Sequence, residues 1–152
     1  MRITIGSDHG GYELKEKLST FLRRLKHKIA DAGTYNQDSC DYPDFGYKVA
    51  KSVAGKKADR GILICKSGIG MCIVANKVPG VRAAVLYDNK QTEFSRLHSD
   101  TNVAVFAASF IKPHKAKELL KIWLKTDFEG GRHNRRLTKI KKIENDFRRK
   151  TK

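Results

Sequence analysis

The residue with the clearest chemical potential is Cys65, which ends the apolar run GILIC at residues 61–65 and precedes the loop KSGIG at residues 66–70. Gly68 and Gly70 permit positive φ angles and let the backbone approach a ligand closely. Successive backbone N–H groups in such a turn, just before a helix, form a concave site for a small oxyanion. A thiolate at a helix N-terminus is stabilised and can act as a nucleophile or a general base. The same residues also fit an inert buried cysteine before a tight turn, and the loop alone leaves both interpretations open.

Asp8, His9 and His98 are the other titratable side chains that fall near predicted strand ends. Asp8 lies in the glycine-rich turn SDHGG, where a carboxylate can hold a sugar hydroxyl. A histidine donates or accepts a proton near neutral pH, although each of the two taken singly also fits an ordinary hydrogen-bonding residue. The remaining histidines have no comparable placement and receive no chemical role: His27, His114 and His133.

Two arginines offer a site for a phosphate group. Arg132 and Arg136 are four residues apart in the segment GGRHNRR, so they share one helical face. Paired guanidinium groups bind phosphate through forked, charge-assisted hydrogen bonds. The alternative is a solvated basic face. The glycine loop itself is not a nucleotide-binding P-loop, because the GxxxxGK[ST] spacing is absent and Lys66 precedes the glycines.

Strands and helices alternate along the chain, and these elements must position the candidate residues. Apolar or β-branched runs predict strands at 2–6, 27–33, 61–65, 81–87 and 102–107, and helical periodicity predicts helices between and after them, the last at about 133–149. The alternation predicts a single α/β domain over residues 1–152, a three-layer, doubly wound, Rossmann-like arrangement of a parallel five-stranded sheet with a C-terminal helix. That last helix carries a sparse apolar stripe that could dock on a second subunit: Leu137, Ile140, Ile143 and Phe147.

Ligands in open parallel sheets bind in the crevice beyond the carboxyl ends of the strands. Three segments are therefore expected to meet there. The first is SDHGG after the first strand, and the second is CKSGIG after the third strand. The third is RLHSDTN, which precedes the fifth strand and brings His98.

Composition excludes several classes of protein. No apolar run approaches the roughly 20 residues of a membrane span, and the N-terminus lacks the layout of a secretion signal, so a cytoplasmic location is expected. The three cysteines include no CxxC pair and no zinc-type cluster with histidine, which gives no support for a metal site. The net charge of +16 is concentrated from residue 112 onward and could attract nucleic acid or smaller anions such as phosphorylated metabolites.

Several segments, taken together and in order, resemble ribose-5-phosphate isomerase type B, a family that also includes subunits of galactose-6-phosphate isomerase. They are SDHGG, DYPD, ILICKSGIGM, ANKVPGVRAA, HSDTNV and EGGRHNRR. The resemblance implies a cofactor-free and metal-free interconversion of ribose 5-phosphate and ribulose 5-phosphate, a step of the pentose phosphate pathway. It also implies a homodimer or dimer of dimers with active sites shared between subunits.

The resemblance also implies a role for each candidate residue. Cys65 would move a proton between C2 and C1 through an enediolate, and His98 would open the furanose ring. The oxyanion would be held by the loop residues Lys66, Ser67, Gly68, Ile69 and Gly70. The sugar phosphate would be held by Asp8, His9, Arg132 and Arg136. Three positions depart from the family pattern, namely Lys66 in place of glycine, Ser99 in place of asparagine and Ser109 in place of arginine. Lys66 or Lys112 is a candidate for the missing positive charge.

Three other functions remain as alternatives. One is an isomerase of a six-carbon sugar phosphate, such as allose 6-phosphate or galactose 6-phosphate. Another is a nucleic-acid-binding protein, although Phe147 is the one aromatic residue on the basic helix and no recognition motif is present. The last is an inactive sensor that keeps the pocket.

Overall fold

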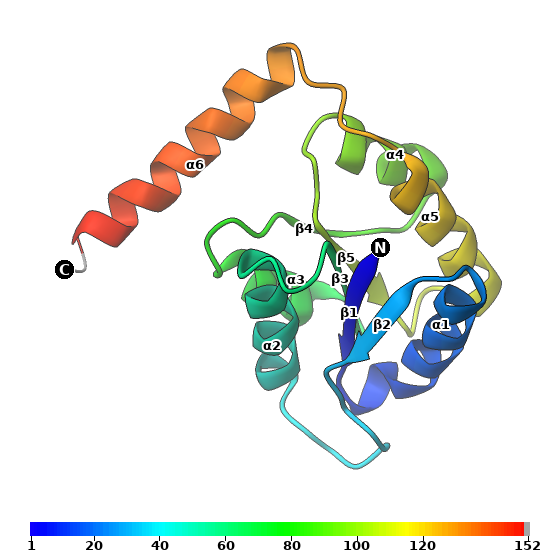
Figure 1. Ribbon diagram of the computed structural model, residues 1–152. Coiled ribbons are helices and arrows are strands. Elements are labelled where there is room, and N and C mark those ends of the chain that lie inside the picture. The colour runs from blue at the N-terminus through cyan, green and yellow to red at the C-terminus, as the bar shows by residue number, and fades with distance from the viewer. Residues whose placement is uncertain (151–152) are drawn as a thin grey trace.

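The protein was examined as a computed structural model that describes the backbone of residues 1–150 and the side chains of residues 1–147. Five strands alternate with helices along this part of the chain, as the sequence predicts (Figure 1). The strands are β1 (Arg2–Ser7), β2 (Lys28–Asp31), β3 (Arg60–Cys65), β4 (Ala83–Val85) and β5 (Val103–Ala107). The helices are the short 3₁₀ helix η1 (His9–Gly11), then α1 (Tyr12–Arg24), α2 (Tyr42–Ala54), α3 (Ile69–Asn76), α4 (Asn89–Leu97), α5 (Pro113–Lys125) and α6 (Arg132–Lys150).

The five strands form one parallel sheet in the order β2-β1-β3-β5-β4, which confirms the predicted doubly wound arrangement. The direction of winding changes between β1 and β3, and this is the point at which open α/β sheets hold their ligands. The registers align Ser7 with Ile64, and Cys65 with Ala107. The carboxyl ends of β1, β3 and β5 therefore lie side by side.

Two apolar layers enclose the sheet, because successive side chains of a buried strand face opposite sides. In β3, Ile62 and Ile64 pack in the cluster formed with α1 and α5, whereas Leu63 and Cys65 pack in the cluster formed with α2 and α3. Figure 1 shows α2 and α3 on one side of the sheet and α1 and α5 on the other. The thiol of Cys65 consequently points toward the side of the sheet that α3 covers.

The fourth strand is shorter than predicted, since three of the seven residues at 81–87 form β4. It lies at the edge of the sheet, where its outward backbone groups have no neighbouring strand. The side chain of Asn76 binds both of those groups at Ala83, accepting from its N–H at 2.9 Å and donating to its C=O at 3.0 Å. This covers the exposed edge, which would otherwise be open to pairing with another chain.

The last helix extends away from the body of the protein in Figure 1. It forms at Arg132–Lys150, as expected for about 133–149. The carboxylate of Glu144 accepts from the backbone N–H of Gly80 at 3.1 and 3.2 Å and ties the helix to the turn before β4. A cleft of about 590 Å³ lies between α6 and that turn. The helices described in the structure include none that is long and apolar enough to cross a membrane.

Candidate active site

Cys65 lies where the sequence places it, at the end of β3 and directly before the loop that leads into α3. Its Sγ accepts a hydrogen bond from the backbone N–H of Gly68 at 3.2 Å. Cys65 is 5% exposed, which leaves it at the border of the apolar cluster under α2 and α3.

Gly68 and Gly70 are each required by the structure of the loop, for different reasons. Gly68 adopts a φ of 75°, in the left-handed region that favours glycine. A Cβ atom at Gly70 would lie 2.7 Å from the ring of Tyr42, so the side chain of Tyr42 packs on bare backbone. The first turn of α3 then presents backbone N–H groups that have no partner within the helix. These groups can serve an oxyanion.

Gly68→Ala tests the importance of this turn. We expect a loss of about 1–2 kcal/mol of stability, because a residue with a Cβ is strained in the left-handed region. The added Cβ would also lie 3.2 Å from Cγ1 of Val85, and the shift of the N–H away from the thiol should lower kcat by about 10²-fold. Denaturant unfolding and steady-state kinetics measure the two effects.

Gly80→Ala is the matched control for this variant. Gly80 also has a positive φ, of 82°, but a Cβ there would meet nothing within 4 Å. The Gly80→Ala variant should lose a similar amount of stability and keep the kcat of the unaltered protein. An equal loss of kcat in both variants would show that the Gly68 effect is one of stability alone.

The N–H of Asp8 donates to the carbonyl of Ile64, the residue before Cys65, at 3.3 Å. Asp8 and His9 therefore lie beside Cys65. One carboxylate oxygen of Asp8 caps η1 by accepting from the N–H of Gly11 at 3.0 Å. Nδ1 of His9 accepts from the backbone N–H of Cys40 at 3.3 Å. A neutral His9 therefore carries its proton on Nε2, where it is available as a donor. The contact from Cys40 to His9 was not predicted from the sequence, which gave Cys40 no role.

Lys66 and Ser67 complete this group of residues on the exposed side of the loop. The aliphatic chain of Lys66 packs directly over the backbone of Gly10. Its carbonyl accepts from the N–H of Ser109 at 3.0 Å, so Lys66 and Ser109, two of the positions that depart from the family pattern, are neighbours. The residues at this edge of the sheet are called the carboxyl-edge group: Asp8, His9, Cys65, Lys66, Ser67, Gly68, Ile69 and Gly70.

His98 does not join this group, and the prediction that its segment enters the same crevice is wrong for a single chain. It follows α4 and precedes β5, so it lies at the amino edge of the sheet. Arg82, the residue before β4, holds the same segment by donating to the carbonyls of Ser99 and Asp100, each at 3.0 Å from Nε. The strand β5 from Val103 to Ala107 spans about 13 Å at 3.3 Å per residue, and this length of strand separates the two edges.

A buried network fixes the segment around His98. Arg96 is 3% exposed, and its Nη1 donates to Asp100 Oδ1 at 2.6 Å and to the carbonyl of Thr101 at 2.7 Å. The indole N–H of Trp123, a fully buried residue of α5, donates to the hydroxyl of Thr101 at 2.8 Å. These bonds anchor the turn after α4 to α5 and so orient His98.

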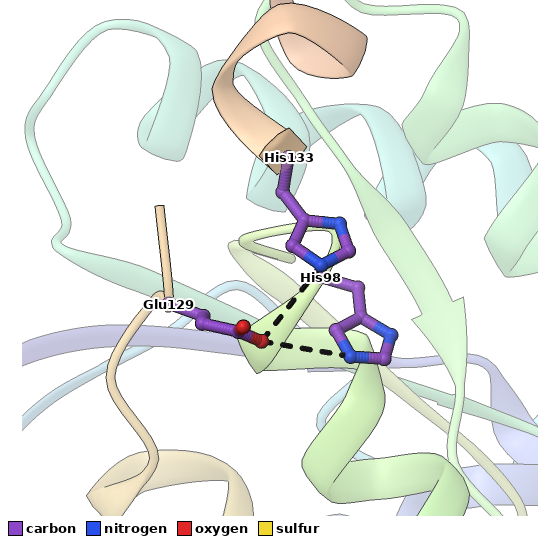
Figure 2. A group of neighbouring side chains, drawn as sticks. All are labelled: His98, Glu129 and His133. Atoms are coloured by element: carbon purple, nitrogen blue, oxygen red, sulfur yellow. Dashed lines mark ion pairs between the residues drawn. The ribbon is translucent and has the colours of Figure 1, made fainter. Parts of the chain in front are cut away.

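His98 has close neighbours from the start of α6, as Figure 2 shows. Its ring stacks between those of Phe94 and His133, with centroid distances of 4.5 and 4.4 Å. Oε2 of Glu129 lies 3.8 Å from Nε2 of His98 and 3.7 Å from Nε2 of His133. Burial, and next the neighbouring His98, lower the pKa of the His133 imidazole. Sequence analysis predicts no role for Glu129 or His133. Their place in EGGRH, next to the predicted phosphate ligand Arg132, is the pattern that could have indicated one.

The two arginines lie at the same edge as His98. Nη1 of Arg136 is 3.3 Å from Nδ1 of His133, and Nε of Arg132 is 3.5 Å from Nε2 of the same ring. The proposed phosphate-binding pair and His98 are thus brought together by α6. These residues are called the amino-edge group: His98, Glu129, Arg132, His133 and Arg136.

The chain thus carries two separate sets of candidate functional side chains, one at each edge of the sheet. The carboxyl-edge group supplies a thiol, a carboxylate and backbone donors, which suit proton transfer next to a developing oxyanion. The amino-edge group supplies an imidazole and two guanidinium groups, which suit ring opening and phosphate binding. Chemistry that needs both sets requires the edges of two chains to meet.

A family model described as Ribose/Galactose Isomerase matches residues 3–140. The ribose-5-phosphate isomerase B of Escherichia coli (strain K12) is 39% identical over 143 residues, covering 94% of this chain and 96% of that protein. The chain belongs to the ribose/galactose isomerase family.

Solved structures show the same fold. The ribose-5-phosphate isomerase B of Clostridium thermocellum superposes with a TM-score of 0.95 at 45% identity, covering 97% of this chain and 99% of that one. The ribose-5-phosphate isomerase B of Mycoplasma genitalium, solved with bound ribulose-5-phosphate, gives a TM-score of 0.91 at 39% identity and covers 95% and 96% of the two chains.

Proposed function

We propose that this protein is an aldose–ketose isomerase that interconverts ribose 5-phosphate and ribulose 5-phosphate. The observation that carries the proposal is the likeness over nearly the full chain to the Mycoplasma genitalium enzyme with bound ribulose-5-phosphate. The position of Cys65 beside a glycine-lined turn supports it independently. With these substrates the enzyme acts in the pentose phosphate pathway, and we place it in the cytoplasm.

The proposed reaction begins with ring opening and ends with a proton transfer. His98 protonates the ring oxygen of the furanose as the anomeric hydroxyl releases its proton to solvent, while the phosphate is held by Arg132 and Arg136. The thiolate of Cys65 then removes the proton from C2 of the open aldose, which leaves an enediolate with its charge on O1. The hydroxyl proton moves from O2 to O1, and the same sulfur returns its proton to C1, which gives the ketose. Backbone N–H groups of the loop at 66–70 stabilise the oxyanion, each contributing about 3 kcal/mol. Asp8 and His9 bind the sugar hydroxyls.

This mechanism requires a homodimer, or a dimer of dimers, with shared active sites. Cys65 and His98 lie at opposite edges of one sheet, so a two-fold arrangement that places the carboxyl-edge group of one chain against the amino-edge group of its partner forms two complete sites. Exposed apolar side chains on α3 and α6 support such an interface. They are Ile69, Ile73, Ile140, Ile143 and Phe147.

The double variant Ile140→Glu/Ile143→Glu tests the dimer. Both side chains lie on one exposed stripe of α6, 46% and 57% exposed, where carboxylates leave the fold of a single chain intact. We expect a monomer by light scattering after size exclusion, with loss of isomerase activity. Lys139→Glu/Lys142→Glu introduces two carboxylates on the neighbouring polar face and should remain dimeric. A dimeric, active apolar-stripe variant would rule out this part of α6 as the interface.

The substrate is tested by turnover of ribose 5-phosphate against allose 6-phosphate and galactose 6-phosphate. A six-carbon preference is the main alternative, since the family description includes galactose and since Lys66, Ser99 and Ser109 depart from the family pattern. We expect the highest kcat/KM with ribose 5-phosphate. A higher kcat/KM with a six-carbon substrate would identify that sugar phosphate as the preferred substrate. The role proposed for Cys65 would not change.

A further inference from the structure

The amino-edge group contains three donor atoms of the kinds that bind transition metals. They are Nε2 of His98, Nε2 of His133 and a carboxylate oxygen of Glu129, all within 4.8 Å of one another. The carboxylate oxygen lies 3.8 and 3.7 Å from the two nitrogens, beyond the 2.7–3.2 Å of direct hydrogen bonds. Donors bound to one tetrahedral zinc ion at about 2.1 Å lie about 3.4 Å apart. We propose that His98, Glu129 and His133 form an inhibitory site for Zn²⁺.

The surroundings of the three residues allow such an ion to enter. In the single chain the side chain of His133 is 2% exposed, whereas those of His98 and Glu129 are 34% and 54% exposed. A site shared between two chains must admit a sugar phosphate, and an ion can enter by the same path. The two imidazole planes are within 9° of parallel, so one ring must turn about its Cβ–Cγ bond to direct both lone pairs at one ion. His98 is the more exposed of the two rings, and turning it would break its stacking on Phe94 and His133. Two histidines and a carboxylate leave the fourth zinc position to water.

Neighbouring charges limit the affinity of the site. Nε of Arg132 lies 3.5 Å from Nε2 of His133, and Nη1 of Arg136 lies 3.3 Å from Nδ1 of the same ring. An ion bound to Nε2 of His133 would replace the contact from Arg132. The charge of Glu129 partly offsets theirs. The site is therefore suited to reversible occupation by a strongly binding ion such as Zn²⁺ and unsuited to Mg²⁺, which prefers oxygen ligands.

Inhibition follows from the atom that the ion occupies. A zinc ion on Nε2 of His98 occupies the imidazole that is proposed to donate the proton to the sugar ring. This consequence rests on the role proposed above for His98, whereas binding of the ion does not.

Binding is measured by calorimetry of the full-length protein, dialysed against a chelator, with zinc chloride as the probe. We expect one ion per chain, and we expect Glu129→Gln and His133→Gln each to weaken binding by more than about 10²-fold. Co²⁺ in the same site should give the visible absorption of a tetrahedral complex with nitrogen and oxygen donors. The matched control is Asp127→Asn, which removes the same charge from an exposed residue of the same loop and should bind zinc as the unaltered protein does.

Cys65→Ala separates this site from zinc capture by the thiol. Zinc binding that survives in Cys65→Ala and is lost in Glu129→Gln supports the proposal, and the reverse pattern overturns it. In the activity assay, micromolar zinc should inhibit the unaltered protein and a chelator should restore its activity. Glu129→Gln, measured against its own activity without zinc, should lose a much smaller fraction at the same concentration. Zinc that binds through Glu129 without inhibiting would confirm the metal site and overturn the role of His98.

Discussion

Replacing Cys65 with alanine is expected to lower kcat for ribose 5-phosphate by roughly 10³- to 10⁴-fold, the upper range for loss of a general base. The sulfur is the one group at the end of β3 that can carry the proton between C2 and C1. The phosphate and hydroxyl contacts belong to other residues, so the variant should still bind the sugar phosphate with a similar dissociation constant. A loss confined to kcat is the mark of a group that acts in the transition state.

Two measurements check this expectation. One is the appearance of ribulose 5-phosphate, and the other is exchange of the C2 hydrogen with deuterated water, which reports proton removal even where no product is released. Calorimetry with ribose 5-phosphate reports binding separately. An unchanged rate of exchange in Cys65→Ala would remove Cys65 from the mechanism.

Cys72→Ala is the matched control. Cys72 lies in α3, one turn from the loop, and its Sγ is 3.5 Å from the carbonyl of Ala83. Burial raises the pKa of the Cys72 thiol, so it stays neutral at pH 7 and cannot replace Cys65 as a base. This variant should keep its kcat. An equal loss of kcat in both cysteine variants would point to a packing effect in the cluster under α3.

Mixing two inactive variants is expected to restore activity. A Cys65→Ala chain keeps the amino-edge group, and a His98→Asn chain keeps the carboxyl-edge group. A mixed dimer of these chains has one complete site and one site that lacks both residues. Random exchange makes half of the dimers mixed, so the mixture should recover roughly a quarter of the unaltered activity in a two-fold dimer with independent sites.

The measurement is an activity assay after subunit exchange, with native mass spectrometry to count mixed dimers. A mixture of Cys65→Ala with the double variant Cys65→Ala/His98→Asn provides the control, since no dimer in it contains Cys65. Recovery in the first mixture and not in the second supports shared sites. Mixed dimers that form and stay inactive would show that Cys65 and His98 do not act in one site formed across the two-fold axis.

Sequence pattern is enough to predict the fold and the half of the candidate site that contains Cys65. Alternating strand and helix periods predict a parallel sheet, and a parallel sheet brings all carboxyl strand ends to one edge. SDHGG and CKSGIG directly follow strands, so their meeting beside Asp8 and Cys65 follows from local pattern alone. The length of β4 was overestimated, because VRAAVLY is apolar enough for a strand but its pairing stops after three residues at the edge of the sheet.

The expected place of His98 beside Cys65 did not follow from the parallel sheet that the same pattern predicts. A residue that precedes a strand lies at the edge opposite to the residues that follow the neighbouring strands, so His98 and Cys65 are separated by the length of β5. The stacking of His133 on His98 and the approach of Glu129 join residues more than 30 positions apart along the chain. Hydrophobic periodicity reports which face of an element is buried and carries no information on which distant side chain covers it. The path of the chain from α5 into α6 makes these contacts, and it is set by the packing of Trp123, Thr101 and Arg96.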